Sequence, residues 1–322
     1  MSASHQVPIL EFPEDMEDLE SSSSSSSRYW APLCAKVREA CESHGFFLLR
    51  YQSVFPRTLR GDMLVAMRSL FDLPDETKSR YQNPKPYRSY NGKCSVVPLH
   101  ESFGIDDPHR LSTASDFTHL MWPHGNPSFC EALHTASSNM LELSSLIMRM
   151  ILESFGMGAE FQSHIHESST VFRLMKYLVP PPFQTTGGGT LGMVAHTDKN
   201  DITILCQNDV QGLEFIPRDA QDKWVQVRVP EDAFVVIVGD SLKAWSNGRL
   251  HAVEHRVVMR GNRERYSWGL FSIPKEGAMI RVPTELIDTD HPLRYRPFKF
   301  SDYISYYVSN IRDDALEVYA GI

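Results

Sequence analysis

Apolar residues in the first half of the chain recur at helical spacing. Over residues 55–71 a large apolar side chain returns every three or four positions, which places these side chains on one face of an α-helix. Residues 33–44 and 129–155 show the same spacing. Gly45 and Gly156 follow these two segments, where a glycine commonly ends a helix. The pattern therefore predicts amphipathic helices that each bury one face in a core.

The pattern changes near residue 169. Short runs of β-branched, aromatic and aliphatic residues are separated there by Gly, Asn, Asp and Pro, as in antiparallel β-proteins. From Asp302 onward the spacing is helical again. We expect a mainly β fold, an antiparallel sandwich or a jelly roll (double-stranded β-helix), with an N-terminal helical region over residues 1–160 and a second domain over residues 161–322 that ends in a C-terminal helix. Strands are predicted at residues 46–49, 171–177, 192–196, 202–206, 213–216, 224–229, 234–238, 251–259 and 266–273.

Composition and charge exclude several classes of protein. With 322 residues, of which 42% are hydrophobic, the chain can bury a large core without disulfides. A formal net charge of −8 argues against a nucleic-acid partner, which normally binds a basic face. No run approaches the ~18 apolar residues of a membrane span, and no signal peptide is recognisable. The five cysteines form no C-x-x-C pair, so we expect reduced thiols in a cytoplasmic protein, which we take to be a monomer.

One segment is of low complexity. Ser21–Ser27 is an unbroken serine run, and the acidic stretch 14–20 precedes it. Serine and charged side chains cannot bury enough apolar surface to offset the entropy lost on ordering. We therefore expect a solvated insertion there.

The triplet His196-Thr197-Asp198 ends a predicted strand and carries the first candidate chemistry. Residues two apart on a strand point to the same face, so the imidazole and the carboxylate would converge on one point. His251 and His255, four apart on another predicted strand, are both candidates for a third ligand. Two histidines and one carboxylate leave three positions of an octahedral metal open, as in non-haem Fe(II) oxygenases. Geometry alone leaves the third ligand undecided.

Arg265 and Ser267 form a candidate clamp for an anion. They share one face of a predicted strand, which continues into the apolar run 268–271 as a buried strand would. A buried guanidinium fork beside a hydroxyl can hold a dicarboxylate. The other arginines of this region are expected on a solvated hairpin: Arg256, Arg260 and Arg263.

Taken together, these motifs resemble the plant 2-oxoglutarate- and Fe(II)-dependent dioxygenases over nearly the whole chain. The spacing agrees, since His255 follows Asp198 by 57 residues and Arg265 follows His255 by 10. Within that family the chain is most similar to the branch of the glucosinolate side-chain dioxygenases, which form alkenyl and hydroxyalkyl products. The motifs that carry the resemblance are Val7–Leu10, Ala40–Phe47, Glu101–Asp107, Arg173–Tyr177, His196–Asn200, Trp245–His251, His255–Val257, Arg265–Ser267 and Phe271–Lys275.

The chain departs from the family pattern at three places. Met175 stands where the family usually has Asn, and Tyr51–Val54 stands where Asn-His-Gly-Val is common. The serine run is an insertion. None of these departures removes a candidate metal ligand or Arg265, so we expect a working enzyme.

The resemblance implies that His196, Asp198 and His255 hold Fe(II) and form the catalytic centre. His255 is preferred over His251 because His255-Arg256-Val257 matches the ligand motif of the family. His251 then becomes a candidate contact of the substrate.

The resemblance also implies the co-substrates and the reaction. 2-Oxoglutarate would chelate the iron, with Arg265 and Ser267 on its distal carboxylate and a hydrogen bond from Tyr177. O₂ would be consumed, ascorbate would serve as reductant, and succinate and CO₂ would be released. The organic substrate would be a small plant specialised metabolite that is hydroxylated, desaturated or closed into a ring. Candidate substrate contacts are Phe271, Tyr90, Phe117, Met121 and His251, followed by Tyr306 and Tyr307.

Three other functions fit parts of the pattern. A non-catalytic, cupin-like protein could bind a small ligand in the same barrel, but it would not need both three metal ligands and an arginine clamp. A nucleic-acid demethylase uses the same iron chemistry, but the acidic net charge opposes it. A zinc hydrolase would need H-E-x-x-H on a helix, whereas Ala252 follows His251 and β-formers surround the segment.

Overall fold

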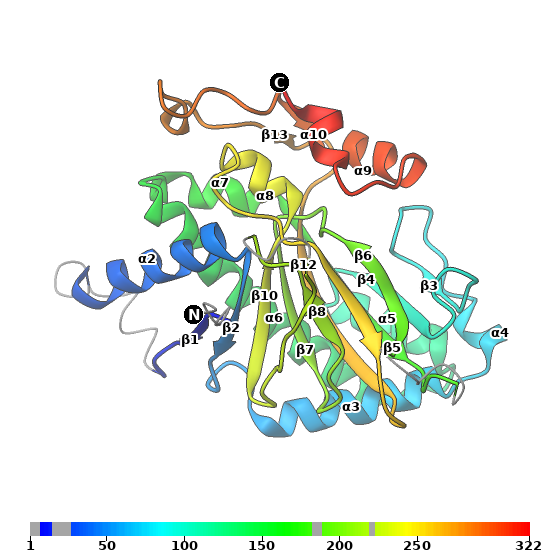
Figure 1. The fold of residues 1–322 in the computed structure, drawn as a ribbon. Helices are drawn as coiled ribbons and strands as arrows, with labels where there is room; N and C mark the ends of the chain where they lie inside the picture. The colour runs from blue at the N-terminus through cyan, green and yellow to red at the C-terminus, as the bar shows by residue number, and fades with distance from the viewer. Residues whose placement is uncertain (1–6, 15–26, 182–188, 219–222) are drawn as a thin grey trace.

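The computed structural model describes residues 7–14, 27–181, 189–218 and 223–322, and the strands within these residues build two main β-sheets (Figure 1). The larger sheet has the order β1 (Ile9–Glu11), β2 (Phe46–Arg50), β10 (Ala233–Val238), β7 (Ile202–Gln207), β12 (Arg265–Pro274), β5 (Ser168–Tyr177), β4 (His100–Asp106) and β3 (Tyr90–Asn91). The smaller sheet has the order β6 (Thr190–His196), β11 (His255–Met259), β8 (Leu213–Phe215) and β9 (Val225–Gln226). A further pair near the C-terminus joins β13 (Met279–Ile280) to β14 (Phe298–Lys299).

Helices cover one face of the larger sheet. The long helix α6 (Pro127–Ser154) runs behind the sheet in Figure 1, and the other helices of this layer are α2 (Ser27–Ser43), α3 (Arg57–Phe71) and α5 (Leu111–Met121). The remaining helices lie between or after the strands: α4 (Asp75–Lys78), η1 (Gly158–Glu160), α7 (Phe161–His166), α8 (Asp240–Trp245), η3 (Thr284–Leu286), α9 (Phe300–Ser309) and α10 (Ala315–Ala320).

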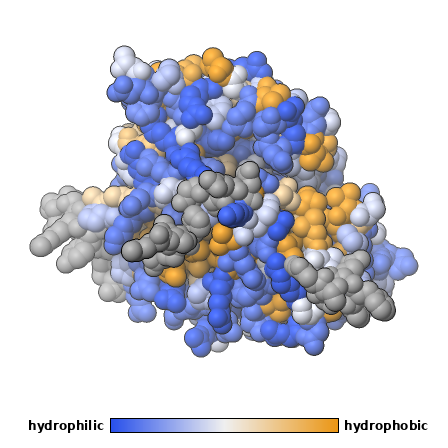
Figure 2. All heavy atoms as spheres, viewed as in Figure 1, coloured by the Kyte–Doolittle hydropathy of each residue, from blue (hydrophilic) through white to orange (hydrophobic). Residues whose placement is uncertain are grey.

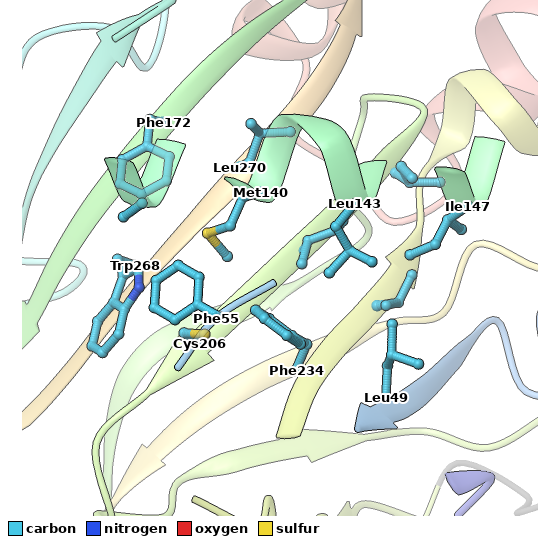
Figure 3. Close-up of a cluster of buried hydrophobic side chains, with 14 of the residues drawn as sticks. Leu49, Phe55, Met140, Leu143, Ile147, Phe172, Cys206, Phe234, Trp268 and Leu270 are labelled. Atoms are coloured by element: carbon cyan, nitrogen blue, oxygen red, sulfur yellow. The ribbon is translucent and has the colours of Figure 1, made fainter. Parts of the chain in front are cut away.

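Successive side chains of each strand point to opposite faces of the larger sheet, so the two faces can pack against different parts of the protein. The face toward the helices is apolar, and Figure 3 shows Phe172, Trp268 and Leu270 of the sheet beside Met140 and other residues of α6. The opposite face meets the smaller sheet in a second apolar cluster. The candidate chemistry lies on this second face, between the two sheets.

The predicted fold class is confirmed. The three amphipathic helices correspond to α2, α3 and α6, and Gly45 and Gly156 follow two of them with φ of +74° and +78°. These angles lie in the left-handed region that glycine adopts at little cost. Most of the predicted strands are present within a few residues of their expected bounds.

Several details differ from the predictions. His251 does not share a strand with His255, because β11 begins at His255 and the backbone nitrogen of His251 donates instead to the carbonyl of Cys41 on α2. Of the strand expected at 224–229, only Val225–Gln226 (β9) forms a strand. The C-terminal tail forms two helices, α9 and α10, instead of one. Strands β3 and β4 and helix α5 were not predicted.

The proposed division of the chain at residue 160 stays a prediction. The strands β1 to β4, all from the first 160 residues, are part of the larger sheet. Residues 21–26 of the serine run lie outside the described residues, and Ser27 is the first residue of α2.

The surface in view is largely hydrophilic. Figure 2 shows apolar side chains gathered in separate areas between the hydrophilic ones. Among the described helices, none combines the length and the apolar character that crossing a bilayer requires.

Candidate metal centre and anion clamp

Strand pairing brings two histidines together. In the smaller sheet, β11 pairs with β6 so that His255 lies opposite His196. Their ring centroids are 4.4 Å apart. The register therefore joins two residues that are far apart in the sequence.

Asp198 completes the group just after the end of β6. Its Oδ1 lies 3.7 Å from Nε2 of His196 and 3.9 Å from Nε2 of His255. One ligand atom from each of the three residues falls within 4.8 Å of the others, and no second cluster of this kind occurs in the described part of the chain. The hydroxyl of Thr203 donates to Oδ2 of Asp198 at 2.6 Å, which leaves Oδ1 to face the histidines.

The hydrogen bonds and charges suit a metal ion. Nδ1 of His196 lies 2.9 Å from the carbonyl of Val194, and Nδ1 of His255 lies 3.2 Å from that of Val253. With a proton on each Nδ1, both Nε2 atoms present a lone pair toward Asp198. Burial, reinforced by His255, lowers the pKa of His196 to about 4, so its imidazole is neutral at pH 7.

The carboxylate of Asp198 is kept ionised against its burial. Burial alone would raise its pKa, but His255, His196 and the hydroxyl of Thr203 hold the pKa below its ordinary value. Two neutral imidazoles and one carboxylate are the donor set of a facial iron site. The residues present therefore fit Fe(II).

The segment that carries Asp198 is fixed by two helices. Lys199 next to it forms an ion pair with Asp240 of α8, at 2.8 Å. The same carboxylate oxygen accepts a hydrogen bond from Tyr303 of α9 at 2.6 Å. The backbone nitrogen of Asp240 donates to the carbonyl of Asp198 at 2.8 Å. Helices α8 and α9 thereby hold the backbone of the metal-binding segment.

Arg265 is fully buried between the two sheets. Its Nη1 donates to Ser267 at 3.1 Å and its Nη2 to the side-chain carbonyl of Gln207 at 2.9 Å. Its Nε has no hydrogen-bond partner among the described residues, and no carboxylate there forms an ion pair with it. A buried guanidinium is costly when it stays uncompensated, so this geometry fits an anionic ligand.

Tyr177 and His100 flank the clamp. The guanidinium of Arg265 lies 5.0 Å from the ring centroid of Tyr177, and the ring of His100 lies 4.9 Å from the same centroid. The Tyr177 hydroxyl lies 3.9 Å from the Met175 sulfur, and the Tyr177 side chain also interacts with Arg265. Burial, with the charges of Arg173 and Arg265, lowers the pKa of His100 to about 3.

The predicted substrate residues separate into two groups. Phe271 is partly buried on the face of β12 that also carries Ser267. Phe117 and Met121 are instead core residues: both are buried in the cluster beneath the helices, with Phe117 packed against Tyr81, Phe103 and Phe129. Their helical spacing could not distinguish a core contact from a substrate contact.

Tyr90 and His251 also have other surroundings. The Tyr90 hydroxyl donates to Glu101 at 2.8 Å, and its ring packs on Phe103, which belongs to the helix-covered face. His251 lies beside the end of α2, and burial lowers its pKa to about 4. Tyr306 packs on Tyr319, whereas the ring of Tyr307 lies 4.4 Å from Nζ of Lys199, next to the metal-binding segment.

Three polar residues of the site were missed from the sequence. Thr203 and Gln207 orient Asp198 and Arg265, and His100 flanks Tyr177. Thr203 and Gln207 both lie in the otherwise apolar strand β7 and are buried. A polar residue inside a predicted buried strand was the available sign. His100 opens β4, a strand that the pattern did not predict.

Comparison with known proteins finds relatives along the chain. Residues 168–274 match the model of the 2OG-Fe(II) oxygenase superfamily, and residues 14–125 match that of the non-haem dioxygenase in morphine synthesis N-terminal region. The probable 2-oxoglutarate-dependent dioxygenase AOP1.2 of Arabidopsis thaliana is 40% identical over 324 residues, which cover 99% of this chain and 97% of that relative.

Solved structures share the fold at full length. The rice dioxygenase for auxin oxidation superposes with a TM-score of 0.79 at 30% identity, covering 98% of this chain and 100% of that one. JOX2, solved in complex with 2OG, Fe and JA, superposes with a TM-score of 0.77 at 25% identity, covering 98% and 89% of the two chains.

Proposed function

The chain belongs to the 2-oxoglutarate- and Fe(II)-dependent dioxygenases, and on this premise we propose that it oxidises a small plant specialised metabolite at a C–H bond, by hydroxylation, desaturation or ring closure. The observation that carries the proposal is the group of His196, Asp198 and His255, with ligand atoms within 4.8 Å of one another. Relatives that act in auxin oxidation or bind JA support a small-molecule substrate.

In this proposal His196 and His255 hold Fe(II) through Nε2 and Asp198 holds it through Oδ1. When bound, the metal and 2-oxoglutarate supply an oxidation by O₂ that releases succinate and CO₂. Thr203 keeps the Asp198 carboxylate in its orientation, because it donates to the oxygen that faces away from the histidines. The three protein ligands would leave the metal open to 2-oxoglutarate and O₂.

Arg265 and Ser267 bind the distal carboxylate of 2-oxoglutarate. Gln207 accepts one guanidinium hydrogen bond and so fixes the plane of the fork, while Nε stays available to the ligand. The Tyr177 hydroxyl, on the neighbouring strand β5, donates a further hydrogen bond to the co-substrate in place of its weak contact with Met175.

The remaining features of the proposal follow from the composition and the family. Ascorbate is the reductant that keeps the iron in the Fe(II) state. The protein acts as a monomer in the cytoplasm, without a nucleic-acid or membrane partner. Phe271 contacts the organic substrate.

Turnover of 2-oxoglutarate tests the proposal. Purified protein with Fe(II), ascorbate, O₂ and a plant extract should release succinate, and mass spectrometry should find a metabolite shifted by +16 or −2 mass units. A chelator should abolish succinate release, and Fe(II) should restore it where redox-inert Zn²⁺ does not. Full recovery with Zn²⁺, or 2-oxoglutarate binding without succinate release, would favour a hydrolase or a non-catalytic binding protein instead.

A further inference from the structure

A second guanidinium beside the metal centre has no anionic partner within the described chain. Arg173 lies on β5, and Nη2 donates to the hydroxyl of Ser102 at 3.2 Å. Its Nε is buried without a hydrogen-bond partner, and no described carboxylate lies within the 4.0 Å of an ion pair. The Asp198 carboxylate is near enough to act on it electrostatically. This charge therefore lies toward the metal centre, and no carboxylate of the described residues forms an ion pair with it.

Among the buried cations of the described chain, Arg265 shares this situation and the lysines do not. Arg265, which we assign to the distal carboxylate of 2-oxoglutarate, has the same two features, an unpartnered Nε and no carboxylate. A buried guanidinium without a counterion destabilises the protein, so its presence indicates that an anionic ligand binds to it. The buried lysines each contact a carboxylate: Lys78 with Glu101 at 2.8 Å, Lys176 with Glu264 at 3.1 Å and Lys199 with Asp240 at 2.8 Å.

The residues that pair directly with Arg173 in the sheet have no side chains. Its cross-strand partners are Gly104 on β4 and Gly269 on β12, so neither neighbour offers a carboxylate or an amide. A Cβ at Gly104 would lie 2.0 Å from the carbonyl oxygen of Tyr87. Glycine at this position thus lets the segment of Tyr87 lie directly against β4. Tyr87 itself has a φ of +62°, a strained value of the kind found at functional sites.

Two aromatic rings flank the guanidinium. Its central carbon lies 5.8 Å from the ring centroid of Tyr87 and 5.7 Å from that of Phe271. Rings on both sides of a cation exclude water from it and offer apolar contact to the body of a ligand. They cannot neutralise a full positive charge, which an anion can.

The formal charges of the site with Fe(II) and 2-oxoglutarate bound indicate the charge of the group that Arg173 would bind. Fe(II), the Asp198 carboxylate, the dianion of 2-oxoglutarate and Arg265 cancel one another when both histidines are neutral. Arg173 then leaves one positive charge uncompensated. We infer that Arg173 binds the carboxylate of the organic substrate, so that the enzyme oxidises monocarboxylic acids with an apolar body between Tyr87 and Phe271. The inference rests on the proposed dioxygenase function and adds the class of its substrate.

Calorimetric titration tests the inference without turnover. Anaerobic protein loaded with Fe(II) and 2-oxoglutarate is titrated with phenylacetic, 3-phenylpropanoic, cyclohexylacetic and octanoic acids and, separately, with their primary amides. At least one acid should bind about tenfold or more tightly than its own amide, because the amide cannot form the charge-assisted bidentate contact. Arg173→Leu should remove this preference, Arg173→Lys should keep part of it, and the exposed Arg263→Leu should keep all of it.

Stability provides an independent measurement. Ligand-free Arg173→Leu should melt at the same or a higher temperature than the wild type, since it removes an uncompensated charge. If the melting temperature falls as much as it does for a substitution in the apolar core, Arg173 has a structural role and the inference is overturned. A preference for acids that survives in Arg173→Leu, or no preference in the wild type, would overturn it as well.

The affinity for 2-oxoglutarate separates the two proposals. It should stay within about twofold of the wild type in Arg173→Leu, because Arg265 is intact. Loss of 2-oxoglutarate binding in the wild type would contradict the proposed function. Normal 2-oxoglutarate binding without a preference for acids would contradict only the role of Arg173.

Discussion

The two faces of strands β5 and β12 differ in chemistry although their residues alternate one by one. Toward the helices the strands present Leu174 and Leu270, which are fully buried in a continuous apolar cluster. Figure 3 shows Leu270 in this cluster. Toward the smaller sheet they present Arg173 and Arg265, two guanidiniums without a carboxylate in the described chain. Burial stabilises the first face by about 25 cal/mol per Å² of apolar area, whereas desolvation of the charges makes the second face costly.

Adjacent residues of one strand therefore have different roles: one contributes to stability and the next to function. An apolar side chain such as Leu270 on the helix-covered face packs against other side chains of the protein. The metal ligands and the two arginines on the other face need a metal ion or a ligand as a partner, so their loss should affect binding more than folding. Substitutions on the two faces should therefore change different measured quantities.

The largest effect is expected at the metal ligands. His255→Ala should lose iron and all 2-oxoglutarate turnover, because two protein ligands do not hold Fe(II) in the facial geometry. His251→Ala should keep iron, since His251 lies beside α2 and not in the ligand group. Iron content of both purified variants decides between them. An iron-free His251→Ala beside an iron-loaded His255→Ala would reverse the assignment.

The next effect contrasts the two faces of β12 directly. Arg265→Leu should raise the KM for 2-oxoglutarate by roughly 30- to 1000-fold with iron retained, since it removes a charge-assisted contact worth about 2–4 kcal/mol. Leu270→Ala, on the other face, should lower the free energy of unfolding by about 2–5 kcal/mol and leave the KM unchanged. Steady-state kinetics and denaturant titration of both variants measure the contrast. An unchanged KM in Arg265→Leu would reject the clamp.

The same contrast explains how much could be predicted from the sequence. Apolar periodicity identified the helix-covered face, because most side chains there pack against other apolar side chains of the chain itself. The metal ligands were found because His196 and Asp198 lie two residues apart, but the pairing of His255 with His196 depends on a sheet register with bulges. No local pattern fixes such a register.

Residues that support the site were harder to find. Thr203 and Gln207 act only through Asp198 and Arg265, so their role appears once β7 is placed beside β12. Arg173 was noticed in the sequence only as part of a motif. Its significance comes from what surrounds it, two glycines across the sheet and no carboxylate, and these neighbours are set by strand pairing.

The smallest effect concerns the hydroxyl that orients Asp198. Thr203→Val keeps the shape of the side chain but removes the 2.6 Å hydrogen bond to Oδ2, so iron affinity should fall about tenfold. Thr170→Val is the matched control, because Thr170 is equally buried and donates at 2.8 Å to the carboxylate of Asp107, which is not a metal ligand. Both variants should lose about 1–3 kcal/mol of stability, since each leaves a carboxylate short of one hydrogen bond. Only Thr203→Val should weaken iron binding, measured anaerobically against a competing chelator. Equal iron affinity in the two variants would mean that Asp198 is oriented by its backbone contacts with α8 alone.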